Sequence, residues 1–164
     1  MNFLEVLQHL TKDGVEFVIV GGVAARLHGS SRLTHDLDIV PNLEEESWKK
    51  LISSIWELDT RPRIPESKER ISDVSNIRQW ITEKHMLALS FRSPSGRVEI
   101  DLLVSESDNF ETLKENAHQI VYAGQTIHIA SIDDLIEMKQ RAGRPQDILD
   151  IETLQEIKSA KDTR

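Results

Sequence analysis

The spacing of hydrophobic positions changes along the chain and predicts a mixture of helices and strands. The apolar residues of 3–10 recur at helical spacing, and an Asp-Gly pair follows them, so a helix should end there. The segment "EFVIV" at 16–20 is almost continuously apolar, as in a strand that is buried on both faces. In "THDLDIVP" at 34–41 apolar and acidic residues alternate, and this period of two predicts a strand with one acidic face.

The rest of the chain continues the same alternation of elements. A short helix should follow the Gly-Gly pair, and Asn42 is placed to cap the next helix. The polar, proline-bearing residues 59–73 predict a long surface excursion, and the last helix should bury a face formed by Ile148, Ile151 and Leu154. One hairpin should pair residues 85–93 with 97–104, and a second should pair 118–123 with 125–131. Two C-terminal helices should follow, over 132–142 and 146–158. This order predicts an α/β protein, more strictly α+β, with a mixed sheet flanked by helices and a helical C-terminus.

Composition limits the domain organisation and the compartment. With 164 residues, the chain should form a single domain over 1–164. Its longest apolar run, at 17–20, is too short to span a bilayer, and its N-terminus has no basic leader. Together with the absence of cysteine, these features predict a cytoplasmic protein. The net charge of −8 argues against extensive DNA binding and suits a cationic partner or a site that is neutralised by metal ions.

The alternating strand at 34–41 carries the first candidate for chemistry. Asp36 and Asp38 lie two residues apart, so both carboxylates should face the same side, roughly 6–7 Å apart along the strand. Two such anions repel each other unless a cation lies between them, and Mg²⁺ prefers oxygen ligands of this kind. The segment "RVEIDLLV" also alternates, and Asp101 would complete a three-carboxylate cluster if the two strands are neighbours, with Glu99 as the alternative.

A Gly-Gly pair precedes this acidic strand. Gly21 and Gly22 lie between a predicted strand and a predicted helix, where backbone N–H groups can approach phosphate oxygens closely. A phosphate-binding turn beside metal-binding carboxylates is the equipment of phosphoryl or nucleotidyl transfer.

The order of these motifs resembles the polymerase-beta-type nucleotidyltransferase superfamily. The segments "GGVAARLHG", "RLTHDLDIV" and "KQRAGRPQDILDIETL" are similar to those of small bacterial nucleotidyltransferase-like proteins related to abortive-infection toxins and antibiotic nucleotidyltransferases. The resemblance runs from about residue 17 to residue 157. It implies a cytoplasmic, magnesium-dependent transferase that moves a nucleoside monophosphate from a nucleoside triphosphate such as ATP to an acceptor hydroxyl, with release of pyrophosphate.

The resemblance also implies roles for individual residues. Gly21 and Gly22 would hold the triphosphate, although many relatives have serine at the second position. Asp36 and Asp38 would bind the magnesium ions, and Asp101 would share one ion and act as, or orient, the base that activates the acceptor hydroxyl.

Basic residues on either side of the acidic strand would meet the phosphates. By resemblance, Arg32 and Thr34 would lie near the nucleotide phosphates, as would Lys139 with Arg141 or Arg144. Basic residues in the last turn of a helix also favour its dipole without any ligand, so the second group has a structural explanation as well. Asp147 matches a further acidic position of the relatives, but it is also placed to cap the final helix after Pro145.

Two other classes of function fit the same residues. The chain contains no evident acceptor-binding domain, which would suit a catalytically degenerate nucleotide-binding protein or a component of a toxin–antitoxin pair, with a cognate antitoxin or a homodimer as partner. Three carboxylates also suit a metal-dependent phosphodiesterase, although that reaction leaves the glycine turn less well explained. A small molecule, a tRNA end or a protein hydroxyl could each serve as acceptor, and the fold does not choose among them.

Overall fold

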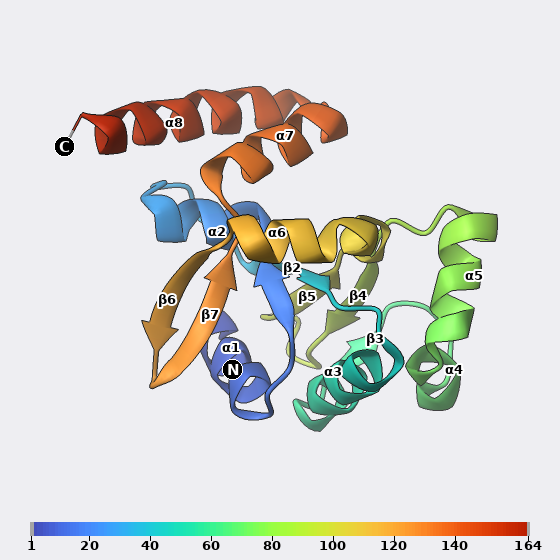
Figure 1. The fold of residues 1–164 in the computed structure, drawn as a ribbon. Coiled ribbons are helices and arrows are strands. Elements are labelled where there is room, and N and C mark those ends of the chain that lie inside the picture. Colours follow the sequence, from blue (N-terminus) through green and yellow to red (C-terminus); the bar gives the residue numbers. More distant parts are fainter. Residues whose placement is uncertain (1, 164) are drawn as a thin grey trace.

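A seven-stranded mixed sheet forms the centre of the molecule. The computed structural model describes residues 2–163 and gives the strand order β3-β4-β5-β2-β1-β7-β6 (Figure 1). The pairs β1–β7 and β2–β5 are parallel, and the remaining neighbours are antiparallel. The strands are β1 (Phe17–Ile19), β2 (Asp36–Pro41), β3 (Arg61–Pro62), β4 (Leu89–Arg92), β5 (Glu99–Leu102), β6 (His118–Tyr122) and β7 (Gln125–Ile129). The expected mixed sheet and α+β class are confirmed.

Helices pack around this sheet, and two of them form a separate layer at one end. Figure 1 shows α7 and α8 stacked on each other beyond the end of the sheet toward which β1 points. The helices are α1 (Phe3–Lys12), α2 (Gly21–His28), α3 (Glu45–Glu57), α4 (Lys68–Ser72), α5 (Val74–Lys84), α6 (Phe110–Asn116), α7 (Ile132–Ala142) and α8 (Pro145–Asp162), with a 3₁₀ turn at Val104–Asn109. None of the helices within residues 2–163 has the length and apolar character needed to cross a bilayer.

The core lies between the sheet and its helices. All three residues of β1 are buried, as the continuous apolar run predicts for a central strand. Trp48 of α3 is fully buried, and its indole N–H donates to the carbonyl of Ile71 at 2.8 Å, which satisfies its polar atom.

Three local expectations are wrong. Residues 59–73 are not a plain surface excursion, because they contain β3 and α4, and Ile71 of α4 is fully buried. Asn42 does not cap α3: its side chain accepts from the N–H of Glu44 at 2.9 Å, and Glu44 is the residue that precedes the helix. Of the apolar face expected on the last helix, Leu154 is buried, but Ile148 is 63% exposed, because α8 turns Asp147 inward in its place.

Candidate active site

The acidic side chains of β2 and β5 lie on one face of the sheet. The parallel register places Asp38 opposite Asp101 and Asp36 opposite Glu99. The alternating Leu37, Ile39, Ile100 and Leu102 are completely buried on the other face. The pairing of the two strands therefore places Asp36, Asp38 and Asp101 on one face, with Asp38 and Asp101 as direct neighbours, although the carboxylate oxygens of these three residues do not all lie within 4.8 Å of one another.

The environment of Asp38 and Asp101 disfavours two negative charges. Burial and, after it, the nearby Asp101 raise the pKa of Asp38 to about 6, while the backbone N–H of Gly22 opposes the shift. Burial also raises the pKa of Asp101, against an opposing contribution from the Ser90 hydroxyl. Among the described residues, Oδ1 of Asp101 is buried and has no hydrogen-bond partner. A buried carboxylate oxygen without a donor, beside a second carboxylate, fits a divalent cation.

The glycine pair lies directly against these carboxylates. The helix was expected to begin after the pair, but Gly21 and Gly22 are the first two residues of α2. Gly21 has a φ of +62°, and a Cβ there would lie 2.1 Å from Oδ2 of Asp38. A Cβ on Gly22 would lie 2.8 Å from Oγ1 of Thr34. Gly21 therefore needs to be glycine, whereas a side chain at position 22 would require the Thr34 side chain to shift; the first turn of α2 contacts Asp38 on one side and Thr34 on the other.

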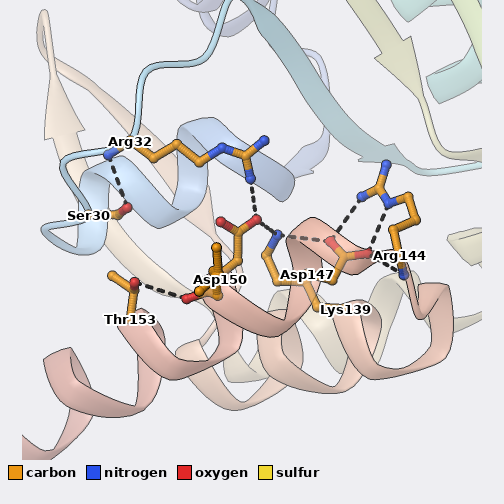
Figure 2. Close-up of polar contacts among 8 residues, drawn as sticks. Ser30, Arg32, Lys139, Arg144, Asp147, Asp150 and Thr153 are labelled. Carbon is orange, nitrogen blue, oxygen red and sulfur yellow. Dashed lines mark hydrogen bonds and ion pairs between the residues drawn. The ribbon is translucent and has the colours of Figure 1, made fainter.

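The basic residues expected near phosphate form a chain of ion pairs (Figure 2). Lys139 of α7 lies between two carboxylates of α8, with Nζ 2.6 Å from Oδ2 of Asp150 and 3.5 Å from Oδ1 of Asp147. Arg32 reaches from the segment before β2 and pairs with Asp150. Arg144 donates to Asp147 through Nε at 2.9 Å and Nη2 at 3.2 Å. The structure therefore unites Arg32, Lys139 and Arg144, although α8 already supplies each of them with a carboxylate.

Asp147 and Asp150, both on α8, are the acidic partners in this network of ion pairs. Asp147 is only 1% exposed and accepts from the backbone N–H of Arg144 at 3.0 Å, so it caps the start of α8. Hydrogen bonds from the Arg144 side chain lower the pKa of Asp147. Asp150 was not singled out from the sequence, although its position one helical turn after Asp147 places both acids on one face. Arg141 does not join the network and pairs with Glu106 and Glu137 instead.

A cavity of about 520 Å³ connects the carboxylates with the C-terminal helices. Asp38, Asp101 and Gly21 line one side of it, and Lys139 and Arg144 line the other. Its apolar lining comes from both sides, through Leu87, Leu103, Leu135, Met138 and Ala142. The cavity therefore combines acidic groups suited to cations, basic groups suited to phosphate, and apolar surface.

A second group with metal-ligating side chains lies elsewhere. Within residues 2–163, only His9, Asp13 and Glu57 bring three such ligand atoms within 4.8 Å of one another; His9 and Glu57 lie on α1 and α3, and Asp13 directly follows α1. Two of these residues have local partners, because His9 lies 3.1 Å from the carbonyl of Ser54 and Asp13 accepts from the Ser54 hydroxyl at 2.7 Å. The group does not line the cavity.

These features define a class of protein fold. A mixed sheet with glycines at the start of α2 and paired carboxylates on β2 and β5 is the arrangement expected of a nucleotidyltransferase fold. Comparison of the sequence with protein families gives no matching family model, and comparison with curated proteins gives no matching relative.

Comparison with solved structures confirms this fold. An antigenic nucleotidyltransferase-like protein from Paracoccidioides brasiliensis is 20% identical with a TM-score of 0.53, over 92% of this chain and 72% of that one. A candidate nucleotidyltransferase from Thermotoga maritima is 15% identical with a TM-score of 0.54, over 99% and 94% of the two chains. ANT(2″)-Ia in complex with adenylyl-2″-tobramycin is 12% identical with a TM-score of 0.55, over 98% and 93%. The chain has the nucleotidyltransferase fold, as the resemblance of its motifs predicted.

Proposed function

We propose that this protein is a metal-dependent nucleotidyltransferase, which transfers a nucleoside monophosphate from a nucleoside triphosphate to an acceptor hydroxyl. The observation that carries the proposal is the buried, partnerless Oδ1 of Asp101, a residue that lies next to Asp38 and lines the same cavity as Gly21. The fold supports the same class of reaction.

Asp38 and Asp101, with Asp36 at the exposed end of the row, would hold Mg²⁺. When bound, the metal neutralises charge on the phosphates during transfer. A cation at this position would also relieve the repulsion that contributes to the raised pKa of Asp38.

The triphosphate would lie between the start of α2 and the C-terminal helices. Backbone N–H groups at Gly21 and Gly22 and the dipole of α2 favour negative charge at that end. Thr34 lies against Gly22 and can donate its hydroxyl. Lys139 and Arg144 line the facing side of the cavity, where their cations would attract phosphate oxygens.

In the proposed reaction, the acceptor oxygen forms a bond to the α-phosphorus as the bond from that phosphorus to the pyrophosphate oxygen breaks. The acceptor proton passes to a carboxylate oxygen of Asp101 and from there to water, while pyrophosphate carries away the bonding electrons. Asp101 is suited to this step by its position, because it lines the cavity directly beside Asp38, where an acceptor hydroxyl can reach its carboxylate.

The test measures pyrophosphate release and transfer of label from α-³²P nucleoside triphosphates, with Mg²⁺ and an extract as the source of acceptor. Asp38→Asn and Asp101→Asn should each lose at least about 100-fold in rate, because each substitution removes a charge that faces the transferring group. Glu57→Gln is the matched control, since it removes a carboxylate from the other candidate metal group and should leave the rate unchanged. Full activity of Asp101→Asn would contradict the proposal.

The same assay separates transfer from nucleotide binding alone. Arg32, Lys139 and Arg144 already have carboxylate partners, and this favours a second candidate, a protein that binds nucleotide without turnover. Calorimetric binding of the triphosphate without any pyrophosphate release would support that candidate.

A further inference from the structure

The sheet face that carries the carboxylates continues onto β4 and the edge strand β3, and both strands carry arginines. Asp38 is in register with Asp101 across β2 and β5, and Asp101 is in register with Ser90 of β4. The N–H of Arg63, directly after β3, donates to the carbonyl of Ser90 at 2.9 Å. One row of neighbours therefore crosses β2, β5 and β4, from Asp38 through Asp101 and Ser90, and ends at Arg63.

A second row runs beside the first. Asp36 is in register with Glu99, Glu99 with Arg92, and Arg92 with Arg61. Residues two apart on a strand share a face, so both rows lie on the same side of the sheet. This face is acidic over β2 and β5 and basic over β3 and β4.

Two arginines of this basic part have charged or aromatic partners. Nη1 of Arg63 donates to Oε1 of Glu99 at 2.7 Å. Glu99 raises the pKa of Arg63, and so does Asp101, which places this guanidinium within electrostatic reach of the candidate active site. The guanidinium of Arg61 lies 5.5 Å from the centre of the Trp56 ring.

Arg92 and the nearby Arg97 are different. Both side chains are exposed, and within residues 2–163 the structure gives neither an ion-pair partner. Arg92 lies against the hairpin turn, since a Cβ on Gly96 would be 3.2 Å from its Nη2. Arg92 is in register with Glu99, but the Glu99 carboxylate pairs with Arg63, so the charge of Arg92 is not balanced by its acidic neighbour.

Protection of the sheet edge explains only part of this pattern. Charged side chains on an edge strand hinder pairing with other chains, and this accounts for Arg61 on β3. Arg92 lies on β4, which β3 already covers, so edge protection does not account for it. Guanidinium groups pair with phosphate oxygens through two parallel hydrogen bonds, and a phosphate-bearing ligand would supply the missing partners.

We propose that the basic part of this face, defined by Arg61, Arg63, Arg92 and Arg97, binds phosphate groups of the acceptor while the acceptor hydroxyl lies at Asp101. This inference rests on the proposed function and specifies its acceptor as a phosphorylated molecule. The phosphates could belong to the 3′ end of a single-stranded RNA or to a small sugar phosphate. A polycation such as the tobramycin moiety in the ANT(2″)-Ia complex would be repelled by the same arginines.

The experiment measures fluorescence anisotropy of a labelled 12-nucleotide single-stranded RNA with a free 3′ hydroxyl, at several salt concentrations. Arg92→Glu should weaken binding about tenfold, and should reduce the slope of log affinity against log salt by about 0.7 for each lost phosphate contact. Arg26→Glu is the matched control, because Arg26 is an exposed arginine on α2 and its substitution changes the net charge equally. It should bind the RNA like the unchanged protein.

Ribose 5-phosphate distinguishes the two sources of phosphate. RNA binding that depends on Arg92 but not on Arg26 supports a nucleic-acid acceptor. Binding of ribose 5-phosphate alone, with the same dependence, supports a small phosphorylated acceptor. The proposal is overturned if neither probe binds, or if the two variants weaken binding equally. Because this readout requires no catalysis, such a result leaves pyrophosphate release as an independent test of the proposed transfer reaction.

Discussion

The carboxylate of Asp38 is an unfavourable place for a negative charge in the absence of a cation. Its environment raises the pKa of Asp38 to about 6, so between about pH 4 and pH 6 the folded chain holds a proton that the unfolded chain releases. Ionisation of Asp38 therefore lowers the free energy of unfolding progressively as the pH rises through that window. Above pH 6 this loss of stability is complete.

Asp38→Asn should therefore stabilise the metal-free protein at pH 8. We expect a gain in the free energy of unfolding of roughly 1–3 kcal/mol, which disappears near pH 4, because the amide carries no charge at either pH. Urea denaturation in EDTA at both pH values measures the difference. Asp36→Asn removes the same charge from an exposed position on the same strand and should gain less. Equal gains at pH 4 and pH 8 would contradict the electrostatic explanation.

Single residues also mark the limit of what the sequence predicts. The period of two placed Asp36 and Asp38 on one face and singled out Asp101, since alternation is a local property of each strand. The basic part of the face was not foreseen. Arg92 becomes a neighbour of Glu99 only through the register of the hairpin, and Arg61 only through a two-residue strand without a periodic signal.

At the scale of elements, α7 and α8 are held together by a nearly buried cation. Lys139 is 8% exposed and lies between Asp147 and Asp150. Removing one member of a buried ion pair is far more destabilising than removing an exposed pair, because the remaining charges keep their desolvation cost.

Lys139→Met should consequently lower the free energy of unfolding by about 3 kcal/mol at pH 7. Arg141→Met is the control: Arg141 is two residues away in the same helix and has exposed ion pairs, so a loss of about 1 kcal/mol or less is expected. Urea denaturation of both variants measures the difference. Similar losses would show that the buried position of Lys139 adds nothing to the stability of the helix pair.

The boundaries of elements were predictable where local chemistry determines them. The Asp-Gly pair ends α1 as expected, and at the start of α7 the Ser131 hydroxyl accepts from the N–H of Asp134. The start of α2 at Gly21 was not foreseen, because the packing of Asp38 against that glycine is a tertiary contact. For the same reason, the apolar spacing of α8 gave no sign that Asp147 would be buried in place of Ile148.

At the scale of the whole molecule, the candidate site joins the sheet to the C-terminal helices, so ligand binding should stabilise the fold as a unit. A ligand that binds only the folded state at 100 times its dissociation constant adds about 2.7 kcal/mol to the free energy of unfolding. For a chain of this size, that corresponds to a rise in melting temperature of about 5–10 °C.

We expect Mg²⁺ with ATP to raise the melting temperature by this amount, and EDTA to remove most of the effect. Asp101→Asn should abolish the rise, whereas Glu57→Gln should retain it, since only the first substitution lies in the cavity. Differential scanning fluorimetry with ATP alone, Mg²⁺ alone and both together gives the measurement. An undiminished rise in Asp101→Asn would place the binding site elsewhere.

The overall class was accessible from the sequence, but the arrangement of strands was not. Alternating helix and strand signals predicted a mixed sheet with a helical C-terminus, and the motifs pointed to the fold that the comparisons confirm. Nothing local indicates that β1 lies between β2 and β7, or that β2 pairs with β5. Those neighbours are far apart in sequence, and only the packing of the complete sheet determines them.

The pairing of Arg32 with Asp150, 118 positions later, has a consequence for biosynthesis. On the ribosome, the segment leading into β2 emerges well before the helix that anchors it, and β1 lacks β7 as a neighbour until residue 129 has been made. Contacts of such large sequence separation form late and slow the folding of a nascent chain. The part of the candidate site made first, with Gly21 and Asp38, should thus stay unfinished until α7 and α8 have been made, so that a product truncated before these helices would lack the complete cavity.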